Sequence, residues 1–290
     1  MPEDTKPARV PYDACPLCGD PAIIDLREVD CTKHECWQPG VPPTIEWCRC
    51  HRCSHVFASG YLNDAALALV LGTTVPGQEP GFDLELQRWR WAEVVERVTR
   101  HLAAPPGRWL DVGFGDGALL FTAAEWGYRA TGIDLREASV ARLRQLGIDA
   151  HCRDIYAVDE PGAYQVVSMA DVIEHMPFPR AAIEQARKLL APGGRLLIST
   201  PNMDTAVWRE LDRVNDNPYW RELEHYHCFT RERLYALLTE CGFGSLQYSV
   251  STRYRSGMDV IAALPQIRVA APGSRPAPGS GGSSPPPRPR

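Results

Sequence analysis

Between residues 108 and 264, short apolar runs alternate with stretches in which apolar residues recur at helical spacing. The runs predict buried strands at 109–112, 130–133, 165–169 and 195–199, with two more strand-like stretches at 246–251 and 258–264. The stretches between them predict helices at 118–126, 138–146 and 181–190. Strands that alternate with helices are typical of α/β domains, so we expect a doubly wound, mainly parallel sheet with helices on both faces.

The rest of the chain divides into three further parts. Residues 61–104 contain two helical stretches separated by Pro and Gly, and they predict a helical bridge to the α/β domain at 105–264. Residues 10–60 hold most of the cysteines and few large apolar side chains. Residues 265–290 contain eight Pro and four Gly, so they bury too little apolar surface to offset the entropy of ordering, and we expect a disordered tail.

The charge of the chain narrows its partners and its location. The 290 residues carry a net charge of −5, but four Arg lie in the tail, and the remainder has 27 basic and 36 acidic side chains. A body this acidic disfavours nucleic acid as a partner, because phosphate contacts need clustered Lys and Arg. No apolar run reaches the roughly 18 residues of a membrane helix, and residues 1–11 lack the apolar stretch of a secretory signal. We therefore expect a cytoplasmic protein without a membrane span, whose oligomeric state the sequence leaves open.

Seven of the ten cysteines lie between Cys15 and Cys53, and in a reducing compartment such clustering indicates metal binding. Two thiolates two residues apart grip one ion from a tight turn, and two such turns complete a tetrahedron of sulfurs. The predicted ligands of a structural Zn²⁺ are Cys15, Cys18, Cys50 and Cys53. Cys48 stays open as a substitute ligand, and Cys31, His34 and Cys36 stay open as a second site. A zinc ribbon at 10–60 with so small a core needs the metal to fold.

A glycine-rich loop, Asp111-Val-Gly-Phe-Gly-Asp-Gly117, follows the first predicted strand of the α/β domain and opens a helix. Its glycines allow a sharp turn and a close approach of the backbone to a ligand. Asp134 ends the next strand, where a carboxylate accepts hydrogen bonds from a ribose diol. Asp154-Ile155 follows the third strand, where the pair is placed to bracket an adenine ring. Asp111 and Asp116 would repel a pyrophosphate, but they suit a cofactor with an ammonium group and a sulfonium centre.

These residues resemble the motifs of the class I S-adenosylmethionine-dependent methyltransferases. The loop is similar to their first motif, Asp134 to their ribose-binding acid, Asp171-Val-Ile-Glu-His175 to the motif after strand four, and Leu190-Ala-Pro-Gly-Gly194 to the turn before strand five. The resemblance covers residues 85–264 and implies a Rossmann-like sheet of seven strands with the last one antiparallel. It also implies contacts with S-adenosyl-L-methionine from Asp111, Gly113, Gly115, Gly117, Asp134, Leu135, Asp154, Ile155 and Ala170.

Methyl transfer to a hydroxyl or an acidic carbon benefits from a general base near the cofactor, at the carboxyl ends of strands four and five. His175 follows strand four, and His225 and His227 lie in an irregular stretch after strand five, so these three are the candidate bases. For each of them the alternative is a histidine that only packs or hydrogen-bonds within its loop. Aromatic residues near the second pair are expected to line an acceptor pocket. They are Trp208, Tyr219, Trp220 and Tyr226.

The motif after strand four also resembles that of the ubiquinone-pathway O-methyltransferases, in which an acid-x-x-Glu-His arrangement holds a divalent ion near a catechol-like acceptor. Asp171, Glu174 and His175 match this motif, with Asp in place of Glu at the first position. The shorter carboxylate argues against a metal role in this chain. The later segment His227-Cys-Phe-Thr230 resembles the family's segment before a helix, and Thr230 is its expected N-cap.

Together these features predict an S-adenosylmethionine-dependent methyltransferase of small molecules, preceded by a structural zinc ribbon. The acceptor is expected to be a sugar, a carrier-bound intermediate or a phenolic metabolite. One alternative is an RNA base methyltransferase guided by the ribbon, against which the acidic charge counts. Another is a non-catalytic cofactor-binding module whose ribbon and tail recruit other proteins. A nicotinamide dehydrogenase is disfavoured by the carboxylates of Asp111 and Asp116.

Overall fold

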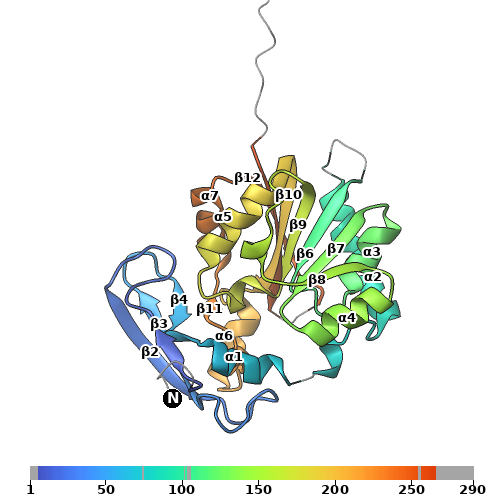
Figure 1. The fold of residues 1–290 in the computed structure, drawn as a ribbon. Helices are drawn as coiled ribbons and strands as arrows, with labels where there is room; N and C mark the ends of the chain where they lie inside the picture. The colour runs from blue at the N-terminus through green and yellow to red at the C-terminus, as the bar shows by residue number, and fades with distance from the viewer. Residues whose placement is uncertain (1–5, 74, 101, 103–105, 254–255, 266–290) are drawn as a thin grey trace, which may run out of the picture.

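Two lobes lie side by side in the computed structural model of the protein (Figure 1). The structure describes residues 6–73, 75–100, 102, 106–253 and 256–265. Strands from the N-terminal part of the chain form the smaller lobe, and a seven-stranded sheet between layers of helices forms the larger lobe. The predicted disordered tail at 265–290 lies outside the described residues, apart from Pro265.

The large sheet has the strand order β12-β13-β10-β9-β6-β7-β8. In chain order its strands are β6 (Arg108–Val112), β7 (Arg129–Asp134), β8 (Asp149–Cys152), β9 (Tyr164–Ala170), β10 (Leu190–Pro201), β12 (Gly244–Val250) and β13 (Gly257–Ala263). β13 runs antiparallel to both of its neighbours, and the strands from β10 to β8 pair in parallel. The prediction of a doubly wound, seven-stranded, mainly parallel sheet with an antiparallel last strand is confirmed. Parallel strands direct their carboxyl ends to one edge, and ligands of such sheets bind at that edge.

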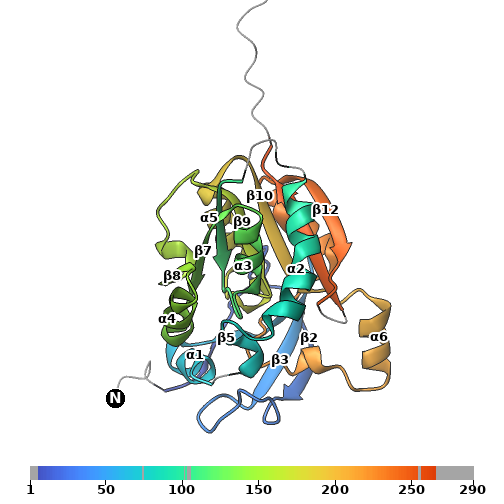
Figure 2. The ribbon, with the colours of Figure 1, turned by 90° about the vertical axis from the view of Figure 1, so that its right-hand side faces the viewer.

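Helices cover both faces of this sheet, because its strands direct apolar side chains alternately to the two faces. One face carries α2 (Leu84–Thr99), α3 (Ala118–Glu125) and α4 (Glu137–Gln145), and α2 and α3 stand in front of the sheet in Figure 2. The other face carries α5 (Pro179–Leu189) and α7 (Arg231–Glu240). Trp109 of β6 packs with α2 and α3, whereas its neighbour Leu110 belongs to the core beneath α5 and α7.

The predicted helical bridge at 61–104 contains α1 (Asp64–Leu71), the short 3-10 turn η2 (Pro76–Gln78) and α2. α2 buries Trp91 and Val95 against α3 and the sheet, so this helix completes the helical layer of the larger lobe. Within the described ranges, no helix has the length and the apolar composition needed to cross a membrane.

The smaller lobe is built around a four-stranded antiparallel sheet whose last strand comes from the larger lobe. β2 (Ile23–Asp30), β3 (Thr44–Cys50) and β4 (Val56–Ala58) pair in succession, and β11 (His227–Cys228) adds to the free edge of β4. β1 (Arg9–Pro11) and β5 (Gly60–Leu62) form a separate two-stranded pair. No local pattern predicts the pairing of β4 with β11, because the two strands lie far apart in the sequence.

A shared apolar core also joins the two lobes. Trp47 of β3 packs with Trp208 of α6 (Ala206–Arg213) and Trp220 of the 3-10 turn η5 (Pro218–Trp220). The indole nitrogen of Trp47 donates to the carbonyl oxygen of Trp220 at 3.0 Å, and the two rings meet edge to face with centroids 5.3 Å apart. The two lobes therefore share an interface with a common apolar core.

Candidate active site

The glycine-rich loop joins β6 to α3 at the carboxyl edge of the large sheet. Gly113, Gly115 and Gly117 have positive φ values of +64°, +54° and +76°, in the region that favours glycine. A Cβ on Gly113 would lie 2.7 Å from Cγ2 of Val172, so a larger residue would push the loop off the segment that follows β9. Apart from its two chain neighbours, no described residue has a heavy atom within 4 Å of a Cβ built on Gly115. The loop therefore has an open side, over Gly115, on which a ligand can lie.

Two carboxyl groups lie at this loop. Asp111 is buried on β6 and accepts a hydrogen bond from Oγ of Ser168 on β9 at 2.5 Å. Burial raises the pKa of Asp111 to about 7. Asp116 accepts from the backbone N–H of Ala118 at 2.9 Å, and burial raises its pKa as well. A buried carboxyl group with a raised pKa ionises when a cation binds beside it, so this site suits a ligand with an ammonium or sulfonium group.

Asp134 ends β7 and is oriented by its neighbour Arg136. Its carboxylate accepts from Nε and Nη2 of Arg136 at 3.0 and 2.9 Å and from the backbone N–H of the same residue at 2.8 Å. The third guanidinium nitrogen of Arg136, Nη1, donates to Oε1 of Gln78 at 2.8 Å. The predicted ribose-binding acid is therefore fixed at the carboxyl end of its strand before any ligand arrives.

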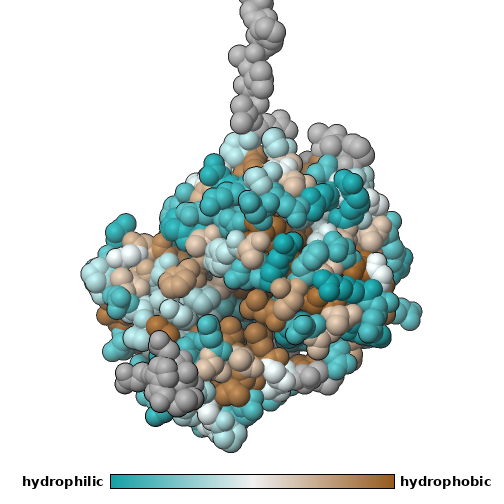
Figure 3. Space-filling view, in the orientation of Figure 1, coloured by the Kyte–Doolittle hydropathy of each residue, from teal (hydrophilic) through white to brown (hydrophobic). Residues whose placement is uncertain are grey.

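A hollow of about 380 Å³ lies beside Asp134, between α1 and the start of α4. Leu67 and Leu71 of α1 line it on one side, and Leu135 and Arg136 line it on the other. Leu135 is 50 % exposed, and the space-filling view shows apolar residues gathered in the hollow at the centre of this face (Figure 3). The volume lies within the range of small-ligand sites. α1 was not predicted at the site, because its short apolar face is typical of ordinary helix packing.

The remaining predicted cofactor residues lie along the same edge. Asp154 caps the 3-10 turn η3 (Ile155–Ala157) by accepting from the backbone N–H of Ala157 at 3.0 Å. The side chain of Ile155 is fully buried in the core, and Ala170 ends β9 in a half-buried position. The roles of these three residues toward an adenine ring stay predictions.

A second group of chemically active side chains lies after β9. Glu174 and His175 belong to the 3-10 turn η4 (Ile173–His175), and His225 belongs to the segment before β11. The structure brings one nitrogen or oxygen from each of the three within 4.8 Å of the other two. The imidazole rings of His175 and His225 meet edge to face, with centroids 4.6 Å apart. Two of the three predicted catalytic histidines are thus neighbours, although they come from distant segments.

The protonation states in this group follow from burial and hydrogen bonding. Glu174 is 1 % exposed, and neither carboxyl oxygen has a hydrogen-bond partner within the described residues. Burial, and then the charge of Asp171, raise the pKa of Glu174 well above its usual value. Burial lowers the pKa of His225 far below its usual value, and the nearby His175 lowers it further. The site thus holds a carboxyl group that favours its neutral form beside an imidazole that does the same.

The tautomer of His175 follows from its hydrogen bond to the segment before β11. Nδ1 of His175 lies 3.2 Å from the carbonyl oxygen of Glu224. A carbonyl oxygen only accepts, so Nδ1 carries the proton and Nε2 of the neutral ring keeps a lone pair. His175 can therefore accept a proton at Nε2.

The divalent-ion set implied by the resemblance does not assemble. Asp171 pairs with Arg253, whose Nη1 lies 2.7 Å from Oδ2 of Asp171. His225, and not Asp171, is the third side chain of the group with Glu174 and His175. A fixed guanidinium on a carboxylate repels a second cation at the same group. These residues therefore do not fit an ion held jointly by Asp171, Glu174 and His175.

His227 lies apart from this group, at the junction of the two lobes. Its Nε2 donates to the carbonyl oxygen of Met176 at 2.9 Å, so its Nδ1 is the acceptor for Nε2–H of His55 at 3.0 Å. Both rings are buried, and burial lowers the pKa of His227 to about 4. Because both nitrogens of His227 are hydrogen-bonded within the fold, this side chain joins the smaller lobe to the larger lobe.

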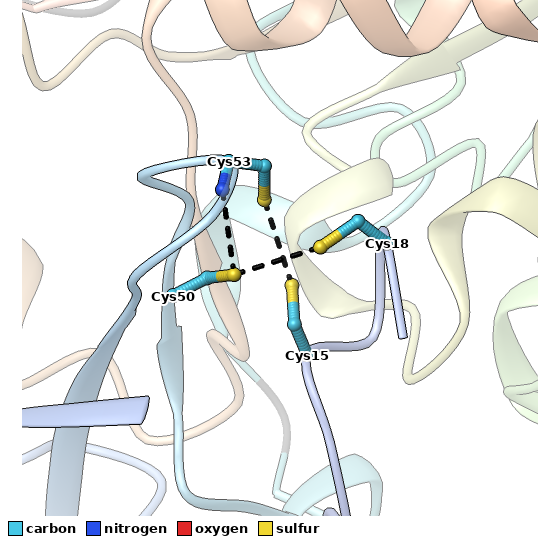
Figure 4. A group of neighbouring side chains, drawn as sticks. All are labelled: Cys15, Cys18, Cys50 and Cys53. Atoms are coloured by element: carbon cyan, nitrogen blue, oxygen red, sulfur yellow. Dashed lines mark hydrogen bonds between the residues drawn. The ribbon is translucent and has the colours of Figure 1, made fainter. Parts of the chain in front are cut away.

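The four predicted zinc ligands converge on one point, as Figure 4 shows. Cys15 Sγ lies 3.7 Å from Cys53 Sγ, and Cys18 Sγ lies 3.5 Å from Cys50 Sγ. All four sulfurs lie within 4.8 Å of one another. An ion bound tetrahedrally by four thiolates at about 2.3 Å requires sulfurs about 3.8 Å apart. The cluster therefore has the size and the donor set of a structural zinc site.

The other cysteines of the lobe have different surroundings. Cys48 Sγ donates to Oδ1 of Asp25 at 3.7 Å and lies outside the four-sulfur cluster. His34 Nε2 lies 3.0 Å from Oε2 of Glu222. In the part of the chain that the structure describes, Cys31, His34 and Cys36 do not form a second metal-binding group.

The aromatic residues expected at an acceptor pocket lie in the interface between the lobes. Trp208, Trp220 and Tyr226 are buried in the shared core with Trp47, and Tyr219 stacks on Trp208 with ring centroids 4.8 Å apart. These rings pack against apolar residues of the smaller lobe, and the sequence pattern does not predict that contact.

The fold and these motifs define a class I S-adenosylmethionine-dependent methyltransferase. The sequence profile of the methyltransferase domain family matches residues 85–248, more than half of the chain, and the chain belongs to this family. A magnesium protoporphyrin IX methyltransferase from Synechocystis, solved with bound S-adenosylhomocysteine, has a TM-score of 0.50 and 20% identity, over 63% of this chain and 86% of its own. A chain from the complex of the Haloferax volcanii Trm112 methyltransferase activator with a putative methyltransferase has a TM-score of 0.51 and 12% identity, over 63% and 92%. At these identities the structural likeness concerns the fold.

Curated relatives point to the same family. A ubiquinone biosynthesis O-methyltransferase of Nitrosococcus oceani is 30% identical over 188 residues, which cover 57% of this chain and 78% of that protein. A protein of the same name from Idiomarina loihiensis is 40% identical over 107 residues, which cover 34% of this chain and 44% of its own. The chain spans about half of the length of most of the curated relatives that it matches.

Proposed function

We propose that the protein transfers the methyl group of S-adenosylmethionine to a small-molecule acceptor and releases S-adenosylhomocysteine. One observation carries this proposal. A single sheet edge combines a glycine loop with an open side, a carboxylate oriented for a ribose and a hollow next to that carboxylate. Membership of the methyltransferase domain family supports the same methyl donor.

In this proposal the cofactor lies across the carboxyl edge. Asp134 accepts hydrogen bonds from the ribose diol, and Arg136 holds its carboxylate in place by two hydrogen bonds. Leu135 and the facing side of α1 hold the adenine in the hollow. The loop from Asp111 to Gly117 passes beneath the amino-acid end. Bound S-adenosylmethionine supplies an electrophilic methyl group on a sulfonium, and the protein positions the acceptor in line with it.

The proposed base belongs to the group after β9. The acceptor loses a proton as its oxygen attacks, and Nε2 of His175 is the atom whose lone pair suits that proton. His225, which is edge-on to His175, is proposed to position the ring, and the neutral Glu174 lies within reach of both. His227 is proposed to be structural, because both of its nitrogens are engaged in the fold.

The acceptor class follows from charge and from the relatives. The acidic body supports a small molecule as the acceptor, because an RNA backbone would be repelled. The relatives are named O-methyltransferases of ubiquinone biosynthesis, which supports a hydroxyl group as the acceptor. The proposed acceptor is therefore a hydroxyl of a phenolic metabolite, a sugar or a carrier-bound intermediate.

The four-cysteine cluster is proposed to hold a structural Zn²⁺. Its thiolates would fix the two turns of the ribbon, and the ribbon in turn carries β4, on which β11 pairs. His225 lies two residues before the start of β11. The metal is thus proposed to hold the base-positioning segment in place without taking part in the reaction.

Isotope labelling tests this function. The protein is incubated with a metabolite extract and S-adenosylmethionine carrying a labelled methyl group, and labelled products are identified by mass spectrometry. Asp134→Ala is the matched control, because it removes the proposed ribose contact. A labelled small molecule that forms with the wild type alone supports the proposal, and labelled RNA as the sole product contradicts it.

Single histidine variants then test the base with the acceptor so identified. His175→Gln is expected to lower kcat by roughly 10²- to 10⁴-fold while the affinity for S-adenosylhomocysteine stays unchanged. His225→Gln is expected to lower kcat less, as a positioning residue, and to shift the pH dependence of kcat. A wild-type kcat in His175→Gln would remove this residue from the mechanism.

A further inference from the structure

An arginine, Arg253, lies at the end of the proposed cofactor site opposite Asp134. Arg253 belongs to the connection between β12 and β13, which emerges at the carboxyl edge because β12 runs in the same direction as β10. Its Nη1 donates to Oδ2 of Asp171 at 2.7 Å, and its Nη2 donates to Oγ of Ser199. Its guanidinium carbon lies 4.0 Å from the ring centroid of Trp91, and its side chain is 8 % exposed. The structure thus fixes one positive charge at this place.

The packing of the glycine loop shows how close this charge lies to the proposed cofactor site. Val172, the neighbour of Asp171, packs so tightly on the loop that a Cβ on Gly113 would lie 2.7 Å from its Cγ2. Asp171 itself has a φ of +56°, a region that residues other than glycine rarely adopt. Such a conformation persists where its surroundings enforce it, and it is common at functional sites. Arg253 therefore contacts the segment that packs directly on the loop.

The order of the strands decides which end of the cofactor arrives there. The order β7-β6-β9 puts the loop after β6 between Asp134, at the end of β7, and Asp171, just after β9. A cofactor whose ribose lies at Asp134 therefore extends its amino-acid end across the loop toward Asp171 and Arg253. That end carries one ammonium group and one carboxylate.

The acidic side chains at this end attract the ammonium group of the cofactor and repel its carboxylate. Burial raises the pKa of Asp111, Asp116 and Glu174, and the nearby charge of Arg253 opposes that rise at each of them. A carboxylate that enters among acidic groups in a buried site needs a cationic partner, because an unpaired buried charge is strongly unfavourable. A guanidinium presents five N–H donors in one plane and can bridge two carboxylates.

We infer, on the basis of the proposed function, that Arg253 binds the α-carboxylate of the cofactor's amino-acid end and bridges it to Asp171. Arg253 is then a cofactor-binding residue, and Trp91 is a positioning residue that supports its guanidinium. The acidic groups of the loop are left to face the ammonium and the sulfonium.

Calorimetry with two ligands tests this inference. S-adenosylhomocysteine carries the amino-acid end, whereas 5′-methylthioadenosine keeps the nucleoside and the thioether but lacks that end. In Arg253→Met we expect the affinity for S-adenosylhomocysteine to fall about 10- to 100-fold, while the affinity for 5′-methylthioadenosine stays unchanged. The retained affinity for the second ligand also shows that the nucleoside half of the site is folded.

The matched control is Arg97→Met. Arg97 pairs with Asp259 at 2.8 Å, and Asp259 accepts from Ser199 at 2.8 Å. This arginine therefore belongs to the same network but is linked to Asp171 only through Asp259, Ser199 and Arg253. We expect Arg97→Met to leave the ratio of the two affinities unchanged.

Each outcome decides the inference. An unchanged ratio of the two affinities in Arg253→Met overturns it. If that variant binds neither ligand, Trp91→Leu decides, since it removes the ring beside the guanidinium but keeps the charge of Arg253 and an apolar side chain in the core. A selective loss of S-adenosylhomocysteine affinity supports the inference, and an unchanged ratio contradicts it. A wild-type protein that binds neither ligand contradicts the proposed function instead, so the two failures are distinguishable.

Discussion

Two edges of the larger lobe are built in different ways: the cofactor edge (residues 108–157) and the ribbon-facing edge (residues 171–229). At the cofactor edge the glycine turn and the oriented acid each arise within a short stretch, as when Arg136 orients Asp134 two positions before it. At the ribbon-facing edge the contacts that join the lobes come from distant segments, as when His55 meets His227, 172 positions away. Local sequence therefore builds the glycine turn and the acid of the half proposed for the methyl donor, and tertiary packing builds the half proposed for the acceptor.

The backbone of the ribbon-facing edge shows the same dependence on distant partners. The N–H of Tyr226 donates to the carbonyl oxygen of Glu174 at 2.8 Å, and the carbonyl oxygen of Tyr226 accepts from Ala58 at 2.9 Å. One residue thus links η4 to the ribbon. We expect a change at the cofactor edge to alter ligand affinity with little loss of stability, and a change at the ribbon-facing edge to alter stability first.

The largest effect is expected from loss of a zinc ligand. Structural zinc contributes roughly 10–16 kcal/mol to folding in isolated zinc-finger peptides, so Cys50→Ser should abolish metal binding and lower Tm by roughly 10 °C or more. Differential scanning calorimetry and metal analysis measure both. Cys152→Ser, at an exposed cysteine on β8, is the matched control and should match the wild type. An unchanged zinc content in Cys50→Ser would show that this thiol is not a ligand.

The next largest effect is expected at Asp134. Two charge-assisted hydrogen bonds of roughly 1.5–3 kcal/mol each are lost in Asp134→Ala, so the affinity for S-adenosylhomocysteine should fall by at least about 100-fold. Calorimetry measures the affinity, and Tm should change little, because the site is built locally. Asp159→Ala, at an exposed acid nearby in the sequence, controls for the change in net charge. Equal affinities in the wild type and Asp134→Ala would refute the assigned role.

A smaller effect, on the pH dependence of stability, is expected from the His55–His227 contact. Burial lowers the pKa of His227 from its ordinary 6.5 to about 4 in the folded protein, so the unfolded chain binds the proton first as the pH falls. Stability is therefore lost between about pH 6.5 and about pH 4, by roughly 3 kcal/mol from this residue. His227→Gln should flatten the dependence of Tm on pH over that range.

The control for this pH dependence is His151→Gln. His151 is 40 % exposed in its side chain and pairs with Asp149 away from the ribbon. The variant should keep the wild-type profile. A His227→Gln profile as steep as that of the wild type would contradict the view that this histidine is held neutral at the junction.

The smallest effect is expected at a local cap. Oγ1 of Thr230 accepts from the backbone N–H of Arg233 at 3.1 Å and caps α7, as the sequence predicts. Thr230→Ala should cost about 1 kcal/mol and lower Tm by about 2–4 °C. Thr239 is the matched control, because its hydroxyl donates to Tyr235 within the same helix and caps nothing. A Tm loss in Thr239→Ala equal to that in Thr230→Ala would contradict the capping role.

The cofactor edge could be predicted closely because short-range rules govern it. A strand followed by Gly113, Gly115 and Gly117 has few ways to turn into a helix, and a carboxylate at the end of the next strand is carried to the same edge by parallel pairing. The four cysteines were predicted for a similar reason, because a Cys-x-x-Cys turn fixes the positions of its two thiols. The convergence of all four sulfurs agrees with that prediction.

The ribbon-facing edge could not be predicted, because its partners meet through packing alone. The sequence does not show that β11 pairs with β4 in the sheet of the smaller lobe, or that Trp208 and Trp220 pack on Trp47. It also does not show that Asp171 forms an ion pair with Arg253. Each of these contacts depends on apolar burial and charge pairing between segments that no spacing rule connects. The distinction between His175, His225 and His227 has the same origin.

The sequence by itself determined the order of strands and helices, the glycine turn, the acid at the end of β7 and the two cysteine knuckles, because hydrogen bonding and backbone geometry act over a few residues. Only the tertiary structure decided which histidine keeps a nitrogen available and which one joins the lobes. It also decided which carboxylate has a fixed counter-charge and which has no partner within the described residues. Burial in a packed core sets those properties, and burial depends on every segment that reaches the site.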